Sequence, residues 1–365
     1  MGTTVYWDII DRCNGRCAYC AVGNALKRPA RPLVPGEKLC RAVDQLADAG
    51  AKGLVVLGGE PTLHPALPDL VDRARERGLP VGIATNALRL ARPLRERLLR
   101  HERVSINVSL DSVLEDENDA VRGTGYYKAC RRHLMALLEE RRAMGSPASV
   151  TVQVTLTRTN LDRLATTLTT LLDWGVDQVL LDRMRAEAFH PPEVRRLRPN
   201  ARERIQGAET LARVAAERGE SRRLLLNYGR ASLRDHLRRR YGATAPAEFW
   251  CEGGWGVAVA DFDGCLHPCR AAANLPEPER ERGRPWYRKA ELRLGTPAAD
   301  RFLEHPYFVD FFNFAHSARV YRQLEQCVRC PHYEVCEPCP LDVAFFGADA
   351  VAECRELEVC HAAAS

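Results

Sequence analysis

The chain has 365 residues, which is long enough for one large and one smaller domain. Of these residues 45% are hydrophobic and 28% are charged, which is the balance of a soluble globular protein. The net charge of +5 is too small to favour a nucleic acid partner, and Arg-rich runs such as 238–240 are typical of a solvated helix face. The sequence has no signal peptide and no apolar run of membrane-spanning length, so it predicts a cytoplasmic protein without membrane contact.

The fourteen cysteines are many for a cytoplasmic chain, and most of them are clustered. Three lie within 13–20, three within 251–269 and six within 327–360. Cys40 and Cys130 stand apart in helix-like segments, where we expect them to be small core residues. Because a reducing compartment argues against a disulfide framework, the clustering indicates metal ligation.

Short apolar runs alternate with amphipathic stretches up to residue 185. Strands are predicted over Thr3–Ile10, Gly53–Leu57, Leu79–Ala84, Val104–Leu110, Ser149–Leu156 and Gln178–Leu181. Helices are predicted over Gly36–Asp48, Leu67–Arg77, Leu90–Leu99, Tyr126–Met144 and Leu161–Trp174. Connections of crossover length indicate a parallel sheet. The pattern predicts an α/β fold, either a partial (β/α)6 TIM-like barrel or an open parallel sheet, with ligands at the carboxyl ends of the strands.

The first strand leads directly into Cys13, Cys17 and Cys20, which are spaced CxxxCxxC. Three thiolates on one tight loop can hold three corners of a cubane 4Fe–4S cluster, and they leave the fourth iron open to a small molecule. A zinc knuckle would need a fourth Cys or His nearby, and no His occurs in the forty residues after Cys20.

Small and polar residues follow the next three strands. The second strand is followed by Gly58, Gly59, Glu60 and Pro61. The two glycines let the backbone approach a ligand closely, and the carboxylate can accept hydrogen bonds from an ammonium group, although a simple Gly-Pro turn has the same composition. The third strand ends at Asn86, and the fourth ends at Ser109 and Asp111. Helix N-capping is the alternative role for these polar residues.

With Tyr19 before the last cysteine of the loop, CxxxCxxC and GGEP together resemble the radical S-adenosylmethionine (radical SAM) superfamily. The resemblance implies that the amino and carboxylate groups of SAM chelate the open iron, and that the GGEP motif holds the SAM amino group. It also places other residues near SAM, its ribose or the substrate, namely Tyr19, Asn86, Ser109 and Asp111. Residues 117–125 are similar to a loop common in this family, with no role implied.

Residues 186–246 are rich in Arg and Pro and contain two or three amphipathic helices, for example Arg202–Arg218. No chemical motif occurs in this segment. We interpret it as a helical bridge that follows the radical SAM domain of residues 1–185 and adds walls to the substrate site. Arg183, at the end of the sixth strand, either meets a substrate carboxylate or forms a surface ion pair.

Residues 247–365 carry the other nine clustered cysteines, and the stretch Phe262–Cys265 predicts a hairpin turn. Two CxxC pairs on their own would suggest a zinc ribbon. The whole layout resembles the SPASM extension of radical SAM enzymes, which carries two auxiliary 4Fe–4S clusters. One departure is that two residues, rather than the three usual in the family, separate Cys336 from Cys339.

The resemblance implies a ligand set for each auxiliary cluster. The first cluster would be bound by Cys251, Cys269 and Cys339, and the second by Cys327, Cys330, Cys336 and Cys354, with Cys360 in reserve for Cys354. Simple alternation puts Cys265 on the same side of its strand as Cys269. We interpret Cys265 as a fourth ligand of the first auxiliary cluster; a hydrogen-atom donor and an inert thiol are the alternatives.

By this resemblance, one-electron reduction cleaves SAM to a 5′-deoxyadenosyl radical that abstracts a substrate hydrogen atom. The auxiliary clusters then assist a net oxidation (dehydrogenation), an epimerisation or a cross-link, and flavodoxin or ferredoxin is the expected electron donor. Because the chain begins at its first strand without a leader-binding domain, the sequence favours an aminoglycoside- or sugar-like intermediate of natural product biosynthesis. A peptide-modifying maturase, of the ribosomal peptide cross-linking or sulfatase type, is the alternative. A non-catalytic iron–sulfur or zinc protein is a further one, although an electron carrier needs no SAM site.

Overall fold

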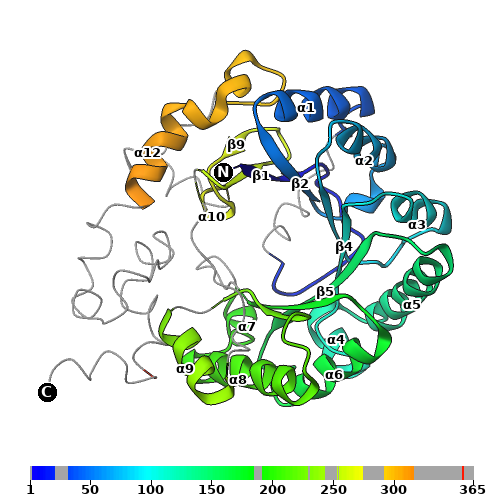
Figure 1. Ribbon diagram of the computed structural model, residues 1–365, viewed down its shortest axis with the longest axis vertical. Coiled ribbons are helices and arrows are strands. Elements are labelled where there is room, and N and C mark those ends of the chain that lie inside the picture. Colours follow the sequence, from blue (N-terminus) through cyan, green and yellow to red (C-terminus); the bar gives the residue numbers. More distant parts are fainter. Residues whose placement is uncertain are drawn as a thin grey trace, which may run out of the picture.

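The computed structural model describes residues 2–20, 32–184, 191–228, 231–242, 253, 255–273, 292–315 and 356. Within them runs a nine-stranded sheet in the order β7-β6-β5-β4-β3-β2-β1-β8-β9. The paired strands from β7 through β1 to β8 are parallel, and β9 is antiparallel to β8. The sheet curves around a centre, and the helices lie outside it (Figure 1). The predicted α/β fold with a partial TIM-like barrel is therefore confirmed.

The bounds of the elements follow the chain order. The strands are β1 (Thr3–Asp8), β2 (Ala51–Leu57), β3 (Val81–Thr85), β4 (Val104–Ser109), β5 (Ser149–Leu156), β6 (Gln178–Arg183), β7 (Leu224–Leu226), β8 (Val257–Ala260) and β9 (Leu266–His267). The α-helices are α1 (Gly36–Asp48), α2 (Leu67–Glu76), α3 (Arg92–Leu99), α4 (Glu115–Arg122), α5 (Tyr126–Met144), α6 (Leu164–Trp174), α7 (Pro192–Arg195), α8 (Ala201–Arg218), α9 (Ala231–Tyr241), α10 (Arg270–Ala273) and α12 (Pro306–Ala315). Two 3₁₀ helices are η2 (Pro61–Leu63) and η3 (Pro297–Glu304).

The strands and helices predicted up to residue 185 are present, and α1, α5 and β5 have the predicted bounds. Three features differ from the prediction. Most of the stretch 117–125, expected to be a loop, belongs to α4. The segment interpreted as a helical bridge also contains the strand β7, which joins the sheet beside β6. The sheet then continues past β1 into β8 and β9.

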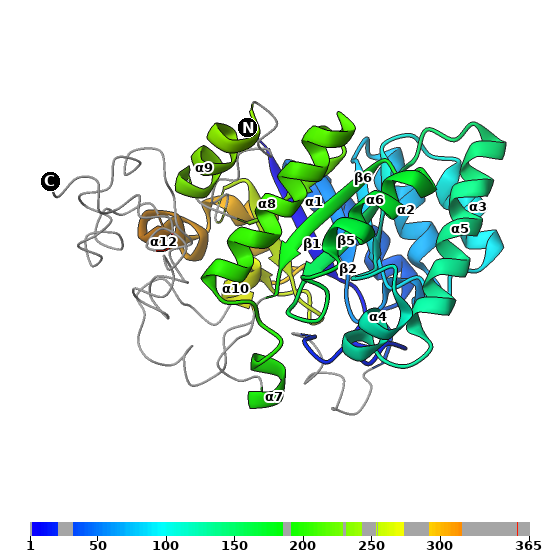
Figure 2. The same cartoon turned by 90° about the horizontal axis from the view of Figure 1, so that it is seen from below.

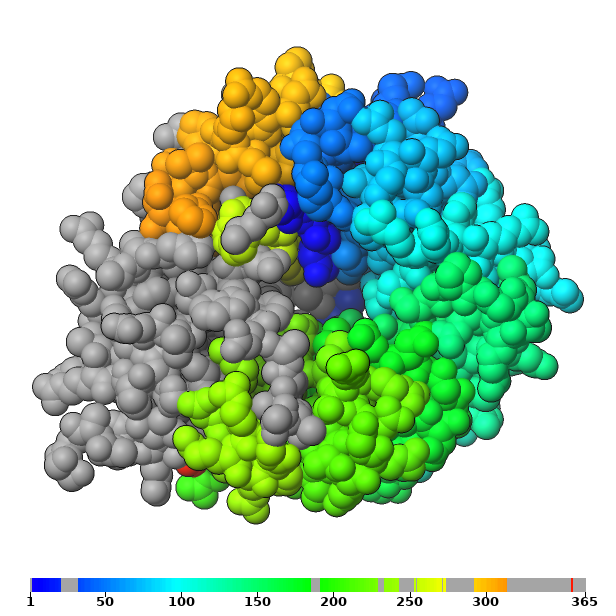
Figure 3. All heavy atoms as spheres, in the orientation of Figure 1, coloured from blue at the N-terminus to red at the C-terminus, as the bar shows by residue number. Residues whose placement is uncertain are grey.

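Strand β4 shows how the sequence separates the two faces of the sheet. Val104, Ile106 and Val108 are buried, and the residues that alternate with them are polar and partly exposed. Parallel pairing aligns that polar face with the next strand, where Asn107 lies beside Thr151 and Ser109 beside Gln153. Apolar residues therefore pack in the core, whereas the other face presents hydroxyl and amide groups. Figure 3 shows a hollow at the centre of the ring.

The described segments from residue 255 onward include several that pack beside β1 and α1. Strand β8 pairs with β1, and the Thr3 hydroxyl donates to the Trp255 carbonyl at 2.6 Å. Gln45 of α1 donates to the Thr296 carbonyl at 2.8 Å and to the Asp300 carboxylate at 2.6 Å, and it accepts from the Gly295 N–H at 2.7 Å. These contacts join residues about 250 positions apart into one packed unit.

In the part of the chain that the structure describes, no helix combines the length and the apolar character needed to cross a membrane.

Candidate active site

The cysteine loop follows β1 and is held by the residues that follow β2. The Gly59 N–H donates to the Ile10 carbonyl and the Glu60 N–H donates to the Arg12 carbonyl, both at 2.7 Å. A Cβ atom on Gly58 would lie 2.4 Å from the Ile10 oxygen, and one on Gly59 would lie 2.1 Å from the Arg12 oxygen. The close approach predicted for these glycines is therefore made to the cysteine loop of the same chain.

Glu60 is buried, and its carboxylate is occupied by groups of the protein. One oxygen accepts from the Thr62 N–H at 3.2 Å, the Thr62 hydroxyl at 2.6 Å and the Thr85 hydroxyl at 2.7 Å. The other oxygen accepts from the Asn86 N–H at 2.7 Å. Burial raises the pKa of Glu60, and these hydrogen bonds oppose that rise. In this structure Glu60 joins the ends of β2 and β3, and a contact with the SAM amino group stays a prediction.

Cys13 and Cys17 receive hydrogen bonds of the kind that cluster-bound thiolates receive. The Gly15 N–H lies 3.2 Å from Cys13 Sγ and the Asn86 side-chain amide lies 3.5 Å from it. The Arg122 guanidinium donates to Cys17 Sγ at 3.8 Å. Burial raises the pKa of both thiols. Three cysteine thiolates, two of them with N–H donors aimed at sulfur, are a donor set suited to a 4Fe–4S cluster with one open iron.

Among the residues with described placement, no three His, Cys, Asp or Glu side chains lie close enough together to hold a single metal ion, and this includes the three loop cysteines.

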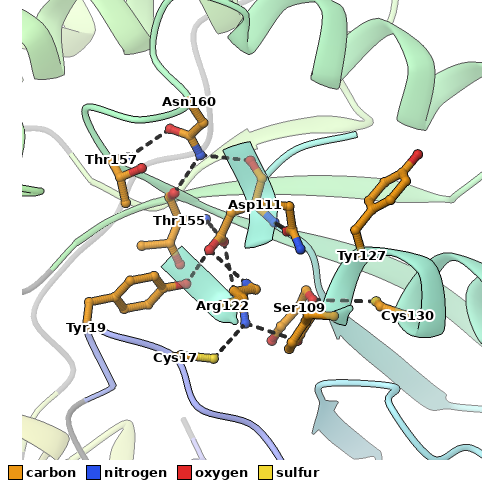
Figure 4. A network of polar contacts seen from close by, with 12 residues as sticks. Cys17, Tyr19, Ser109, Asp111, Arg122, Tyr127, Cys130, Thr155, Thr157 and Asn160 are labelled. Atoms are coloured by element: carbon orange, nitrogen blue, oxygen red, sulfur yellow. Dashed lines mark hydrogen bonds and ion pairs between the residues drawn. The ribbon is translucent and has the colours of Figure 1, made fainter. Parts of the chain in front are cut away.

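A buried polar network lies beside the loop (Figure 4). Asp111 has no exposed surface, and its carboxylate accepts from Arg122 Nε and Nη2, each at 2.8 Å, from the Thr155 N–H at 2.9 Å and from the Tyr19 hydroxyl. Both carboxylate oxygens are thus used within the protein. Asp111 therefore positions its neighbours here, and its predicted contact with a ribose or substrate stays untested.

Tyr19 and Ser109 border the same network. Burial raises the pKa of Tyr19 well above its usual range, so its hydroxyl acts as a donor to Asp111. The Ser109 carbonyl accepts from the Tyr126 hydroxyl at 2.9 Å and from Cys130 Sγ at 3.7 Å. Asn86 also donates to the Asn14 side chain at 2.8 Å. The structure thus brings Tyr19, Asn86, Ser109 and Asp111 around the cysteine loop.

Arg122 is one of three residues of this network that the sequence did not single out. It was part of a stretch noted only as similar to a family loop, and its partner Asp111 lies eleven positions earlier in the chain. The signal that could have indicated the Asp111–Arg122 pair is an acidic residue at the end of a strand, followed by an arginine at the end of the next helix. Thr155 and Asn160 were also missed, because they contact Asp111 from the next strand and the loop that follows it.

Two of the predicted auxiliary ligands are described: Cys265 in the β8–β9 hairpin and Cys269 just after it. The predicted turn of the hairpin is present, with Gly264 at φ +75°. The Cys265 N–H donates to the Asp261 carboxylate at 2.9 Å, and the backbone of Cys265 bridges to Arg293. Burial raises the pKa of the Cys265 thiol, whereas Arg293 opposes the rise.

The predicted alternation between Cys265 and Cys269 is wrong, because β9 ends at His267. Cys269 instead precedes α10, and its Sγ accepts from the Ala272 N–H at 3.3 Å. Next to it, Arg270 forms a two-armed ion pair with the buried Asp8 at the end of β1. The other predicted auxiliary ligands lie outside the described residues: Cys251, Cys327, Cys330, Cys336, Cys339, Cys354 and the reserve Cys360.

A parallel α/β barrel with three thiolates on the loop after its first strand defines a class of protein that binds an iron–sulfur cluster at the carboxyl end of the strands. Residues 7–171 match the radical SAM superfamily. These residues therefore form a radical SAM domain, and proteins with this domain use a 4Fe–4S cluster and SAM.

Relatives of known name are similar over different shares of the chain. PqqA peptide cyclase of Ruegeria pomeroyi is 29% identical over 291 residues, which cover 78% of this chain and 73% of that protein. The mycofactocin maturase MftC of Mycobacterium tuberculosis is 30% identical over 159 residues, which cover 43% of this chain and only 39% of MftC. The structure of anSMEcpe with bound AdoMet and the Cp18Cys peptide matches with a TM-score of 0.70 at 13% identity, over 100% of this chain and 97% of that one, which shows the shared fold.

Proposed function

We propose that this protein is a radical SAM enzyme that modifies a peptide, with further iron–sulfur clusters in a SPASM-type domain over residues 247–365. The observation that carries the proposal is the cysteine loop, which is fixed by Gly59 and Glu60 at the carboxyl end of the barrel strands. Support for the peptide comes from the similarity over most of the chain to an enzyme named as a peptide cyclase. The anSMEcpe structure, which has the same fold, holds a peptide together with AdoMet.

The sugar-like substrate that the sequence analysis favoured finds no support among these relatives. That preference rested on the position at which the chain begins, which says nothing about its partner. The polar inner face of β4 and β5, with Asn107, Thr151 and Gln153, supplies donors and acceptors suited to peptide groups. The nature of the modification, whether cyclisation, another cross-link, dehydrogenation or epimerisation, is part of the same proposal.

The cysteines of the loop and the groups that donate to them have roles in the proposed mechanism. Cys13, Cys17 and Cys20 would hold three irons of the cluster, and the Gly15 and Asn86 N–H groups would stabilise the Cys13 thiolate. When bound and reduced, the cluster and SAM together supply a 5′-deoxyadenosyl radical able to abstract hydrogen from a C–H bond. The protein orients the substrate and limits the access of water to that radical.

The roles beyond the first cluster are also proposals. Cys251, Cys269, Cys339 and Cys265 would serve one auxiliary cluster, and Cys327, Cys330, Cys336 and Cys354 the other. A small electron-transfer protein such as flavodoxin or ferredoxin would reduce the SAM cluster.

Anaerobic reconstitution tests the proposal. We expect about twelve irons per chain, from three cubane clusters, and release of 5′-deoxyadenosine that depends on SAM and on a reductant. The triple variant Cys13/Cys17/Cys20→Ala should keep about eight irons per chain and should release no 5′-deoxyadenosine. Zinc in place of iron, or undiminished 5′-deoxyadenosine release by the triple variant, would contradict the cluster assignment.

A labelling experiment tests the substrate class separately. The reconstituted protein and SAM would be incubated with deuterated short peptides whose sequences are encoded beside the gene of this protein. Deuterated aminoglycosides serve as the comparison. Transfer of deuterium into 5′-deoxyadenosine from a peptide, together with a mass change of that peptide, is the expected result. Transfer from the aminoglycoside alone would refute the peptide and leave the radical chemistry intact.

A further inference from the structure

Helix α4 lies against the cysteine loop, which the sequence analysis did not foresee. The Ala18 N–H, between Cys17 and Cys20, donates to the Val121 carbonyl of α4 at 2.8 Å. Figure 2 shows α4 and the segment that follows β1 on the same side of the barrel. The last residue of this helix, Arg122, is buried, and its guanidinium lies over the ring of Tyr19 at 5.7 Å and over that of Tyr126 at 5.2 Å. Backbone and side chain of the helix end are thus both committed to the loop.

The orientation of the guanidinium is set by Asp111. Two parallel hydrogen bonds of 2.8 Å join Arg122 Nε and Nη2 to the two carboxylate oxygens, which is the bidentate geometry that fixes an arginine in one plane. The remaining nitrogen, Nη1, is thereby directed at Cys17 Sγ, 3.8 Å away, and at the Tyr126 hydroxyl, 3.2 Å away. The cationic end of the pair therefore faces the sulfur.

This arrangement has an electrostatic consequence for a cluster bound at Cys17. Asp111 and Arg122 offset each other in net charge, but the pair keeps a dipole whose positive end is nearest the sulfur. Both groups are buried, so solvent and salt screen this dipole little. Hydrogen bonds and positive charge at a ligand sulfur stabilise the reduced state of an iron–sulfur cluster and raise its potential. The described donors to Cys13 are uncharged, whereas the donor to Cys17 is a cation.

We infer that Arg122 is a positioning residue that holds the Cys17 arm of the loop and raises the reduction potential of the SAM-binding cluster. The inference rests on the proposed function, because it requires a cluster on Cys13, Cys17 and Cys20. Its ligand is the thiolate sulfur of Cys17, and its charge partner is Asp111.

The test is a redox titration of the reconstituted protein without SAM, followed by electron paramagnetic resonance. Subtracting the spectrum of the Cys13/Cys17/Cys20→Ala variant isolates the signal of the SAM-binding cluster. In Arg122→Gln we expect the equilibrium constant for one-electron reduction to fall about tenfold, which lowers the potential by about 59 mV. Arg122→Lys keeps the positive charge but loses the two-armed hydrogen bond to Asp111, so its reduction potential should lie between those of Arg122→Gln and the wild type.

Two further variants separate tuning from folding. Asp111→Asn/Arg122→Gln removes both charges, so it avoids a buried unpaired carboxylate and should still show the lowered potential. Arg95→Lys is the matched control, because Arg95 is another buried arginine with a two-armed pair, to Glu140, between the outer helices α3 and α5. Its potential should equal that of the wild type.

The outcomes distinguish the two proposals. A wild-type spectrum identical to that of the triple cysteine variant would overturn the proposed function and this inference together. If the wild type shows the cluster signal, but the double variant and Arg95→Lys have the same reduction potential, the role of Arg122 is overturned and the proposed function stands.

Discussion

Gly59→Ala is the substitution that most directly tests how the cysteine loop is held. The new Cβ atom would lie 2.1 Å from the Arg12 carbonyl oxygen and 3.0 Å from the Cys13 nitrogen, and both are backbone atoms that cannot rotate away. The loop must therefore move as a unit. That movement separates Cys13 from the residues that follow β2 and β3.

The size of the effect follows from the contacts that the movement breaks. Two backbone hydrogen bonds, from Gly59 to Ile10 and from Glu60 to Arg12, are lost or lengthened, at about 0.5–1.5 kcal/mol each. The backbone shift forced by overpacking adds about 1–3 kcal/mol. We expect the metal-free protein to lose about 2–6 kcal/mol of stability, and the reconstituted protein to lose about four irons per chain.

Gly53→Ala, within the strand β2 that precedes Gly59, is the control, since its Cβ would meet its neighbours no closer than 3.6 Å, an ordinary contact. Urea unfolding and iron analysis of the two variants provide the comparison. The reasoning is refuted if Gly59→Ala binds as much iron and unfolds at the same urea concentration as Gly53→Ala.

The other predictions concern Cys130, Arg270 and Gln45, which belong to the frame around the site. Cys130 is buried and its pKa is raised to about 12 by desolvation, so it should resist iodoacetamide at pH 8 until the protein unfolds. The ordinary thiol pKa is 9.0, so the stability linked to the raised pKa is fully present below pH 9. As the pH rises from 9 towards 12, the free energy of unfolding of the wild type should fall by about 1.4 kcal/mol per pH unit relative to that of Cys130→Ala. Equal urea midpoints of the two proteins across that window would contradict the assignment. Arg270→Met leaves Asp8 buried and unpaired and should destabilise the protein by about 3 kcal/mol in urea unfolding, with most of the loss recovered in Asp8→Asn/Arg270→Met; an equally unstable double variant would count against the ion pair. Gln45→Ala removes three hydrogen bonds and should speed hydrogen exchange in residues 292–315 by at least tenfold, whereas Arg41→Ala on the exposed face of α1 should leave it unchanged.

The barrel could be read from the sequence because its signals are local. Apolar runs that alternate with amphipathic stretches decide the elements, and α5 ends before Gly145, whose left-handed backbone is a common helix C-terminus. The placement of polar residues at the strand ends also came from local pattern, since the carboxyl ends of parallel strands meet at one edge.

The contacts that hold the site could not be predicted, because they join distant segments. Nothing in the stretch around Arg122 indicates that its guanidinium reaches Cys17, 105 positions earlier. The sequence predicts that Gly58 and Gly59 let a ligand approach the backbone. It does not show that the loop after β1 passes within hydrogen-bond distance of the Gly59 N–H. Alternation failed between Cys265 and Cys269 because a strand of two residues ends before the pattern can repeat.

The position of β8 beside β1 has a consequence for the order in which the protein is made. Val259 pairs with Tyr6, 253 positions earlier, so β1 leaves the ribosome long before this neighbour is made. At about 5–20 residues per second, that interval is on the order of tens of seconds. Throughout it, β1 has an unpaired edge, which is a template for wrong pairing. The nascent chain thus presents its cysteine loop beside an open sheet edge, and protection of that edge during synthesis is as much a requirement for this protein as the supply of iron.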